Sequence, residues 1–479
     1  MTSAAGSSDI ARVNVPGEAP SHPYSEGIRS VRTRDDARAA IMAAYRGRTA
    51  RSYAFHEDAR NLLPSGVARS TVFYAPYPIC IASGRGCHVT DLDGHEYIDQ
   101  ICNFGSMIHG HAHPVVTAAV VAQLERGTDF GGPNEPQLAL AREIARRVPS
   151  VERLRFTTSG TEAILYAVRA ARAFTGKPKI LKMEGSYHGG YDAVSVSVDP
   201  GASPTTYPRG ELEGPGLPPE VTEHTLVAPY NDLERCSELI RAHADELAVV
   251  LVEALTMRGL IAGDLEFLAG LREVTREHGV LLLLDEVVTF RLAEGGAQRL
   301  VGITPDLNTF GKLIGGGLPV GAFGGRADVM EGFQVGRTDH VHHSGTLSGN
   351  AAVAAGGLAN LSLLTADAII RLNALGDRLR EGLRSVLESA GVPAQLTGRG
   401  SLVGLHLTDR PVTNYRSSLS ADRDAMRWLH LALLNHGVFA RAAGAFLLST
   451  PMDEADIDTT TAAFARALDD ARPLLGASE

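Results

Sequence analysis

The chain has 479 residues, of which 44% are hydrophobic and 21% charged, which is enough for a large core divided between a large and a small domain. Its formal net charge of -10 argues against a nucleic-acid partner, and no apolar stretch approaches the roughly 20 residues of a membrane span. Glycine is unusually frequent, with 51 residues, and must serve places that need backbone more than side chain.

The N-terminal end is polar and without periodicity. We predict an arm over residues 1–50, partly flexible, and both simple disorder and a segment that embraces a dimer partner fit its composition. The first thirty residues lack a basic start and an apolar block, so no secretory signal is expected. The four cysteines show no CxxC spacing, which favours a reducing cytoplasm.

Strands come next along the chain. Residues 72–82 and the segment after them are predicted as strands, and Asp93-Gly94 between alternating apolar positions predicts a hairpin. Residues 115–127 have helical spacing and end on a glycine. We assign residues 51–115 to the small domain, as its N-terminal segment.

The centre of the chain, residues 116–360, alternates between strands and helices and is predicted to form the large domain. Residues 247–253 and 280–286 are apolar without alternation, as expected for a parallel sheet covered on both faces. Between them, residues 264–278 have one apolar face, with Asp264 placed to cap the start of a helix. These patterns predict an α/β domain.

After residue 360 the pattern changes. Two long helical segments are followed by a strand pair, residues 401–408 and 438–450, and by a final helix from about residue 453. We predict that residues 361–479 form a smaller α+β domain, which the early strands near residues 72–100 join.

Seven glycines lie between Gly311 and Gly325, in the string TFGKLIGGGLPVGAFGG. A P-loop is excluded because Asp306 occupies its first glycine position and Leu313 follows the lysine; a GxGxxG dinucleotide motif is absent as well. What remains is Lys312 among small residues that let a planar ligand approach the backbone. An imine-forming lysine suits this setting, although most lysines are solvated surface residues.

Two further features join this lysine. Asp285 follows four leucines at the end of a predicted strand, where it could pair with a protonated pyridine nitrogen; alone, an ordinary turn aspartate explains it equally well. Ser159, Gly160 and Thr161 end a strand and open a helix, which forms a phosphate site or a plain capped helix start. An imine lysine, a pyridinium partner and a phosphate cradle together describe pyridoxal phosphate (PLP).

The sequence resembles the class III (ω-) aminotransferases of PLP fold type I, with the glutamate-1-semialdehyde aminomutase and β-phenylalanine aminotransferase branch most similar. The resemblance rests on strings in the family's order: FYAPYP, DLDGHEYID, GHAHP, RFTTSGTEA, EGSYHGGYD, LLLLDEVVTFR, TFGKLIGGGLPVGAFGG and SGTLSGN. It implies an α/β fold in which a mostly parallel, seven-stranded sheet lies between helices, with a smaller α+β domain built from both chain ends.

The resemblance also implies residue roles. Lys312 would form the imine with PLP and move the proton, and Asp285 would contact the pyridine nitrogen. The other implied cofactor contacts are Ser159, Gly160, Thr161, Tyr187 stacked on the ring with His188 beside it, Glu253, and Thr346 from the neighbouring subunit of a homodimer. The chain departs from the family at Glu253-Ala254, where Glu-Pro is usual, and in DEVVTFR, which lacks a glycine.

Two arginines are candidates for a substrate carboxylate, because guanidinium binds carboxylate in a bidentate manner. Arg69 and Arg441 match positions used for substrate acid groups in this branch, and Arg258, in the altered loop, is a weaker third candidate. A surface or structural ion pair remains an equal alternative for each.

Two histidine clusters invite a metal interpretation, namely 109–113 and 340–343. Neither has the cysteine or carboxylate neighbours that would complete a site, so we expect no metal.

The predicted function is that of a PLP-dependent aminotransferase working as a cytoplasmic homodimer with shared active sites. It would move an amino group from a small-molecule donor, a β- or ω-amino acid, to a keto acid or aldehyde through pyridoxamine phosphate. Two alternatives stay open: an aminomutase that transfers the group within one molecule, and an aminotransferase acting on a ketone that is not an amino-acid derivative. A catalytically inactive relative is disfavoured because Lys312, Asp285 and the phosphate loop are all present.

Overall fold

The structure, a computed structural model, describes residues 33–202 and 206–475. Its largest sheet has seven strands in the order β4-β10-β9-β8-β7-β5-β6. The pairs from β9 to β6 are parallel, whereas β10 runs antiparallel to both β4 and β9. This confirms the predicted mostly parallel sheet. The strands are β4 (Arg153–Thr157), β5 (Lys179–Met183), β6 (Thr225–Ala228), β7 (Leu247–Glu253), β8 (Leu281–Asp285), β9 (Leu307–Gly311) and β10 (Gly321–Gly325).

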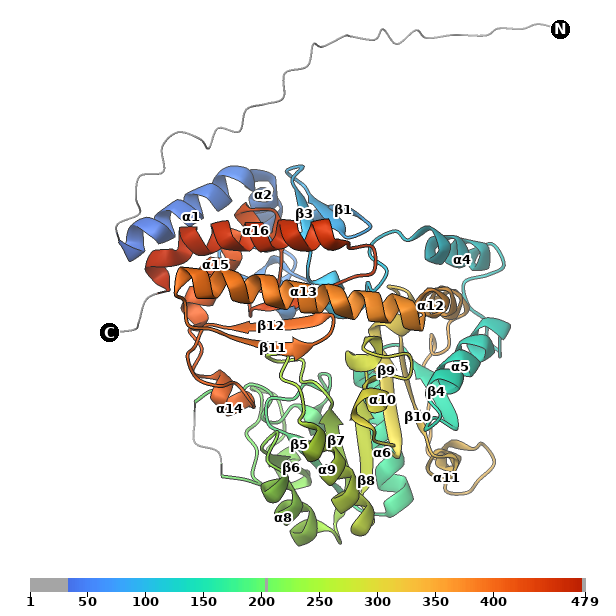
Figure 1. Cartoon of the computed structure of the whole chain (residues 1–479). Helices are drawn as coiled ribbons and strands as arrows, with labels where there is room; N and C mark the ends of the chain where they lie inside the picture. The colour runs from blue at the N-terminus through green and yellow to red at the C-terminus, as the bar shows by residue number, and fades with distance from the viewer. Residues whose placement is uncertain (1–32, 203–205, 476–479) are drawn as a thin grey trace, which may run out of the picture.

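Helices cover both faces of this sheet (Figure 1). They are α5 (Glu135–Arg147), α6 (Gly160–Thr175), α7 (Val221–His224), α8 (Leu233–His243), α9 (Leu265–Glu277), α10 (Ala297–Val301), α11 (Ala327–Met330) and α12 (Ala351–Leu363), and α4 (Pro114–Leu124) packs on α12. Val249 and Leu251 of β7 pack in the same cluster as α6, while Val250 and Val252 pack with α8 and α9. Alternate residues of one strand therefore face two different helix layers, which explains why the strand sequence is apolar throughout.

Two smaller sheets lie toward the other end of the molecule. One has the order β1-β2-β3-β13 and the other β11-β12-β14. Their strands are β1 (Ile81–Arg85), β2 (His88–Asp91), β3 (Glu96–Asp99), β11 (Gln395–Arg399), β12 (Leu402–His406), β13 (Val438–Phe439) and β14 (Ala445–Leu447). The predicted hairpin at Asp93-Gly94 joins β2 to β3, with Gly94 at φ 90°. Because β13 pairs with β3, strands from both chain ends share one sheet.

Long helices pack around these small sheets, and Figure 1 shows α13 running lengthwise above β11 and β12. These helices are α1 (Arg34–Arg48), α2 (Ala50–Ala59), α13 (Ala366–Ala390), α15 (Arg423–Asn435) and α16 (Glu454–Ala471), and the short α14 (Tyr415–Ser418) precedes α15. Among the described residues no single helix is long and apolar enough to cross a membrane; only α12 and α13 taken together meet that test, and they bend by 74° at their break.

The arm predicted over residues 1–50 differs from the structure where the two can be compared. Residues 1–32 lie outside the described residues. Residues 33–50 are helical instead, because Thr33 caps α1 by accepting a hydrogen bond from the backbone of Asp36. Ile41 and Tyr45 of this helix are buried in the same core cluster as α15. The division of the chain into domains otherwise stays a prediction.

Three local predictions need correction. The strand predicted over residues 72–82 begins only at Ile81, because prolines before it lack the N–H that a strand ladder needs. Of the strand predicted over residues 438–450, only Ala445–Leu447 pairs with β12, and Val438–Phe439 joins β3. Asp264 precedes α9 as expected, but its side chain makes no capping hydrogen bond.

Candidate active site

The ends of neighbouring strands bring the predicted cofactor residues together. Asp285 ends β8 and Glu253 ends β7, and the two are paired in register. Lys312 follows β9 directly, and Thr309 of β9 is paired with Asp285. In an open α/β sheet, side chains at the carboxyl edge of the parallel strands face bound ligands. We call Ser159, Gly160, Thr161, His188, Asp285 and Lys312 the strand-end group.

The carboxylate of Asp285 is buried and held by three neighbours. One oxygen lies 2.9 Å from Nδ1 of His188, and the other accepts hydrogen bonds from the Thr309 hydroxyl (3.1 Å) and the Val287 N–H (3.1 Å). His188 is buried as well, and among the described residues its Nε2 has no hydrogen-bond partner. These contacts fix the orientation of Asp285, and the unpartnered nitrogen marks a place that a ligand can complete.

Lys312 lies in a strained turn. It adopts φ 50°, in the left-handed region that residues other than glycine rarely occupy, and it opens the 3-10 turn Lys312–Gly315. Burial lowers the pKa of its amine, while Asp285 and Glu253 act in the opposite direction. Within the described residues this amine forms no hydrogen bond or ion pair. Lys312 is thus a half-buried residue whose amine has a lowered pKa and is free to form an imine.

The turn between β4 and α6 is a helix start with free N–H groups. Ser159 is the N-cap of α6, and its hydroxyl accepts a hydrogen bond from the backbone of Glu162. The capped-helix interpretation is therefore correct, yet it leaves the N–H groups of Gly160 and Thr161 in the first turn, where helices bind anions. Gly160 and Gly311 both pack against Val287, since a Cβ added to either would lie 3.4 Å from its side chain. This close packing keeps the helix start beside the Lys312 turn.

Tyr187 and Glu253 are joined to each other. The N–H of Tyr187 donates to Glu253 (3.2 Å), and the other carboxylate oxygen accepts from the backbone of Met257 (2.9 Å). Burial raises the pKa of Glu253 to about 7. The Tyr187 side chain is 43% exposed, which leaves its ring accessible to a ligand. Glu253 thus connects the loop that carries Tyr187 to the altered loop after Ala254.

Thr346 is the one predicted cofactor residue that the structure does not bring to this group. It is exposed, in the segment before α12, and none of its described contacts reaches the strand-end group. Neighbouring apolar side chains are exposed there too, with Leu347 at 56% and Val335 at 81%. A contribution to the site of a partner subunit stays a prediction.

The two candidate substrate arginines meet at one aromatic ring that the sequence did not single out. The guanidinium carbons of Arg69 and Arg441 lie 5.3 Å and 5.1 Å from the centre of the Phe104 ring. Arg69 also donates to Asn103 (2.7 Å), and Arg441 lies 3.5 Å from the Met257 carbonyl oxygen. We call Arg69, Asn103, Phe104 and Arg441 the Phe104 group.

No acid neutralises the Phe104 group among the described residues. Burial lowers the pKa of Arg441 to about 10, and the next contribution comes from another cation, Arg258. Arg258 itself is engaged, because it pairs with Asp199 (2.8 Å) and lies 3.7 Å from Glu213. Arg69 and Arg441 therefore carry uncompensated positive charge, whereas Arg258 does not.

A left-handed turn carries Asn103 and Phe104. Cys102, Asn103 and Phe104 have φ values of 48°, 45° and 57°, and Gly105 follows at 87°. Three consecutive residues other than glycine in this region store strain, which is common at ligand sites. No sequence signal indicates such a turn apart from Gly105, which explains why Asn103 and Phe104 were missed.

The histidines of the two clusters do not converge on a common point. His109 contacts Thr450 and Asn360, and His111 pairs with Asp99 at 2.8 Å. In contrast, Cys87, His88 and Asp456 have spacing compatible with a metal. These residues already bond one another, with the Cys87 thiol 3.5 Å from Asp456.

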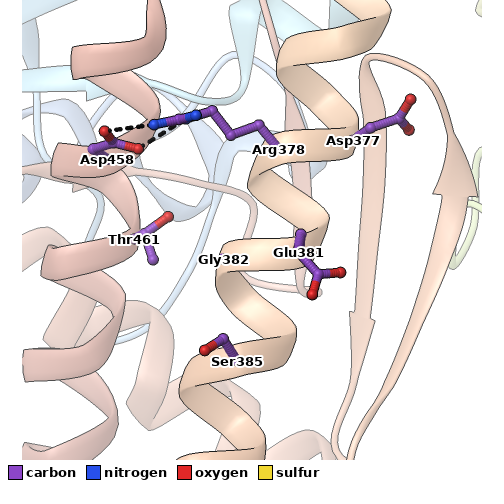
Figure 2. A pocket seen from close by; sticks show the side chains of 7 residues that line it. All are labelled: Asp377, Arg378, Glu381, Gly382, Ser385, Asp458 and Thr461. Atoms are coloured by element: carbon purple, nitrogen blue, oxygen red, sulfur yellow. Dashed lines mark hydrogen bonds and ion pairs between the residues drawn. The ribbon is translucent and has the colours of Figure 1, made fainter.

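A hollow with a volume of about 590 Å³ lies between α13 and α16. Figure 2 shows Arg378 reaching across it to Asp458, with which it forms an ion pair of 2.9 Å. Gly382 permits the close approach of the two helices, since an added Cβ would lie 2.7 Å from the Thr461 hydroxyl. No residue of the strand-end or Phe104 groups lines this hollow.

The strand-end group fits PLP in each of its chemical parts. Lys312 supplies an unpartnered amine for an imine, Asp285 a buried carboxylate for a pyridine nitrogen, and the start of α6 N–H groups for a phosphate. The unpartnered buried nitrogen of His188, beside Asp285, gives a further polar atom to this place.

Comparison with known proteins gives the same family. Residues 70–468 match the family described as Aminotransferase class-III. A glutamate-1-semialdehyde 2,1-aminomutase of Syntrophobacter fumaroxidans is 40% identical over 418 residues, covering 86% of this chain and 95% of that protein.

Solved structures agree in fold and in sequence. An omega-transaminase from Sphaerobacter thermophilus superposes with a TM-score of 0.86 at 43% identity, over 88% of this chain and 98% of that one. A β-phenylalanine aminotransferase from Variovorax paradoxus gives 0.84 at 37%, over 93% and 100%. A transaminase with PLP bound also gives 0.84 at 37%, over 90% and 99%. The chain belongs to the class III aminotransferases, enzymes of PLP fold type I that use PLP as their cofactor.

Proposed function

We propose that this enzyme transfers the amino group of a β- or ω-amino acid to a keto acid or aldehyde. The observation that carries the substrate class is the uncompensated charge of Arg69 and Arg441 at the Phe104 ring. A guanidinium that has no acid partner and is partly desolvated binds a carboxylate strongly. The likeness to a β-phenylalanine aminotransferase and an omega-transaminase supports the same substrate class.

The strand-end group supplies the chemistry in this proposal. When bound, PLP withdraws electrons from the substrate carbon that carries the amino group. Lys312 would hold the cofactor through its Nζ atom and, once free, would take and return the proton at that carbon. Asp285 would hold the proton on the pyridine nitrogen, and His188 and Thr309 orient its carboxylate.

The remaining residues bind and enclose the cofactor. Ser159, Gly160 and Thr161 would bind its phosphate at the start of α6, and the partly exposed ring of Tyr187 would stack on the cofactor ring. Glu253 accepts a hydrogen bond from the backbone N–H of Tyr187 and so fixes the loop beside the proposed cofactor site.

We infer a homodimer in which Thr346 completes the phosphate site of the partner subunit. Support comes from the exposed segment around Leu347 and Val335, since apolar side chains on a surface mark a contact with another protein. The four cysteines are free thiols, which supports a cytoplasmic location.

The second candidate is an aminomutase that returns the amino group to the same molecule. It is favoured by the 40% identity with a glutamate-1-semialdehyde 2,1-aminomutase. An aminotransferase acting on a ketone that is not an amino-acid derivative stays open because of the altered loop after Glu253. The proposed aminotransferase and the aminomutase differ in one requirement. An aminotransferase needs a separate keto acceptor, and an aminomutase does not.

The test compares two amino donors that differ mainly by a carboxylate. β-Phenylalanine and 1-phenylethylamine are offered to the purified enzyme, with and without a keto acid, while the absorbance of the bound cofactor is followed. We expect turnover of the acid only with the acceptor present. Arg441→Met and Arg69→Ala should each lower kcat/KM for the acid by about 10²-fold and leave the amine within about threefold. A separate assay offers an amino aldehyde without any acceptor. An equal loss on both donors, or turnover in that separate assay, would contradict the proposal.

A further inference from the structure

A chain of buried hydrogen bonds joins the C-terminal part of the molecule to the Lys312 turn. Thr450 follows β14, His109 precedes α4, and Asn360 lies near the end of α12. His109 is 4% exposed and Asn360 3% exposed. The residues come from three distant parts of the sequence, so their contact is a product of the fold.

Both ring nitrogens of His109 are occupied. Nε2 lies 3.0 Å from the backbone carbonyl oxygen of Asn360, and Nδ1 lies 2.7 Å from the Thr450 hydroxyl. Because a carbonyl only accepts, Nε2 carries the hydrogen and Nδ1 accepts from Thr450. Burial lowers the pKa of His109 to about 4, which keeps the ring in this neutral form.

The side chain of Asn360 continues the chain of bonds to the lysine turn. Its amide nitrogen donates to the carbonyl oxygen of Leu313, the residue after Lys312, at 2.7 Å. This bond acts on the peptide next to a lysine that is held at φ 50°. A left-handed residue persists only where its surroundings hold it.

Backbone contacts press the same turn against α12. An added Cβ on Gly357 would lie 2.0 Å from the Ile314 carbonyl oxygen, and one on Gly316 would lie 2.7 Å from the Gly356 carbonyl oxygen. Side-chain packing is incomplete here, because a hollow of about 60 Å³ is lined by His109, Gly316 and Asn360, among others. The hydrogen bond from Asn360 therefore fixes the Lys312–Gly315 turn where side-chain packing is incomplete.

We propose that Asn360 and His109 are positioning residues that hold Lys312 in its left-handed conformation and tie that conformation to the C-terminal part of the chain through Thr450. Neither residue contacts Lys312 itself; Asn360 acts through Leu313, and His109 acts through the backbone of Asn360. The inference rests on the proposed role of Lys312 as the cofactor-binding lysine.

The alternative is that the pair only satisfies buried polar groups. A structural role predicts lower stability without a change in the chemistry of Lys312, whereas a positioning role predicts a change in that chemistry as well. The matched control is Asn373 of α13, whose amide also donates to a loop carbonyl, that of Leu292, at 3.0 Å. Asn373→Leu removes this bond, together with the one that its Oδ1 accepts from the Ser401 N–H, away from the Lys312 turn.

The first experiment compares Asn360→Leu with Asn373→Leu in the PLP-loaded enzyme and in the cofactor-free protein. For Asn360→Leu we expect kcat to fall by about 10²-fold with KM for the amino donor nearly unchanged, as for a misplaced reacting group. The pH midpoint of the absorbance of the Lys312-bound cofactor should move by about one unit, and uptake of PLP by the cofactor-free protein should slow. Asn373→Leu should lower only the melting temperature. Asn360→Ser serves if the leucine variant does not fold.

The second experiment tests the coupling of the two residues. His109→Leu should reproduce part of the Asn360→Leu effect, and His109→Gln, which keeps an N–H donor, should restore most of it. In the double variant the two effects should not add, because they act on one turn. An unchanged absorbance midpoint and kcat in Asn360→Leu, with only a lower melting temperature, would overturn the inference. Lys312→Ala separates the cases: if it still turns over, the proposed role of Lys312 is wrong, and the inference falls with it.

Discussion

The strand-end group and the Phe104 group are built in opposite ways. In the first, Asp285 is buried, has a hydrogen-bond partner on each oxygen, and lies at the end of a strand inside a seven-stranded sheet. In the second, Arg69 is exposed and Arg441 has no acid partner among the described residues. Both guanidinium groups contact the ring of Phe104, which lies in a strained turn.

This difference separates what is common to the family from what selects a substrate. A carboxylate that must keep the same ring nitrogen protonated throughout every turnover gains from rigid orientation. Guanidinium groups that must release one acid and bind another benefit from lying on loops, where their charge is accessible and has no acid partner. The comparison predicts that changes in the first group affect all substrates, whereas changes in the second discriminate among them.

The largest expected effect is at Lys312. Lys312→Ala should abolish turnover of every donor and remove the absorbance of a lysine-bound cofactor, because the site then lacks its unpartnered amine. Absorbance spectra of the purified protein before and after addition of PLP measure this. A variant that keeps both the band and the activity would show that the reactive amine lies elsewhere.

Asp285→Asn should come next, with a fall in kcat of about 10³-fold for acids and uncharged amines alike, as for loss of a preorganised charge. The asparagine keeps the hydrogen bond to Thr309 and the size of the side chain, so retention of PLP is expected. Single-turnover kinetics with both donors provide the measurement. A loss confined to acids would place Asp285 with the Phe104 group and break the comparison.

Glu253 offers a smaller and pH-dependent effect. Its pKa is raised by burial to about 7, so the folded state binds this proton more tightly than the unfolded chain does. The associated stability is present at low pH and is lost as the pH rises toward the folded pKa. Between about pH 6 and about pH 8 the wild type should lose about 1 kcal/mol relative to Glu253→Gln. Thermal unfolding of both proteins across this range measures the difference, and parallel pH curves would contradict the raised pKa.

The smallest effect is expected at Arg258. Because Asp199 already neutralises it, Arg258→Gln should change the ratio of kcat/KM for β-phenylalanine and 1-phenylethylamine by less than about twofold. It is the control for Arg441→Met, since both variants remove one positive charge from the same region. A large loss of acid selectivity would show that Asp199 releases Arg258 when substrate binds.

The sequence predicts the first group far better than the second. A run of leucines that stops at Asp285 and a glycine-rich segment around Lys312 place both residues at strand ends, and the parallel sheet then brings them together. The roles of Arg69 and Arg441 came from resemblance alone. Their meeting point at Phe104 depends on a turn of three residues other than glycine at positive φ, for which propensities give no warning.

Other misses have different causes. Helix α1 had a readable start, Thr33 followed by two acidic residues, which the small and polar character of the preceding segment obscured. The antiparallel direction of β10 has no local signal, because strand direction follows from the connection and not from the residues. The bond from Asn360 to Leu313 joins residues 47 positions apart and could not be inferred from spacing.

The antiparallel β10 has a consequence for cofactor retention. At Gly321 this strand lies so close to the start of α6 that an added Cβ would come within 2.1 Å of the Ser159 carbonyl oxygen. A side chain there would displace Ser159 at the start of α6, where we propose that the phosphate binds. The variant would therefore bind PLP more weakly, and a smaller fraction of the enzyme would hold it. By mass action a higher concentration of PLP raises that fraction again, so added PLP should restore the activity of a Gly321 variant.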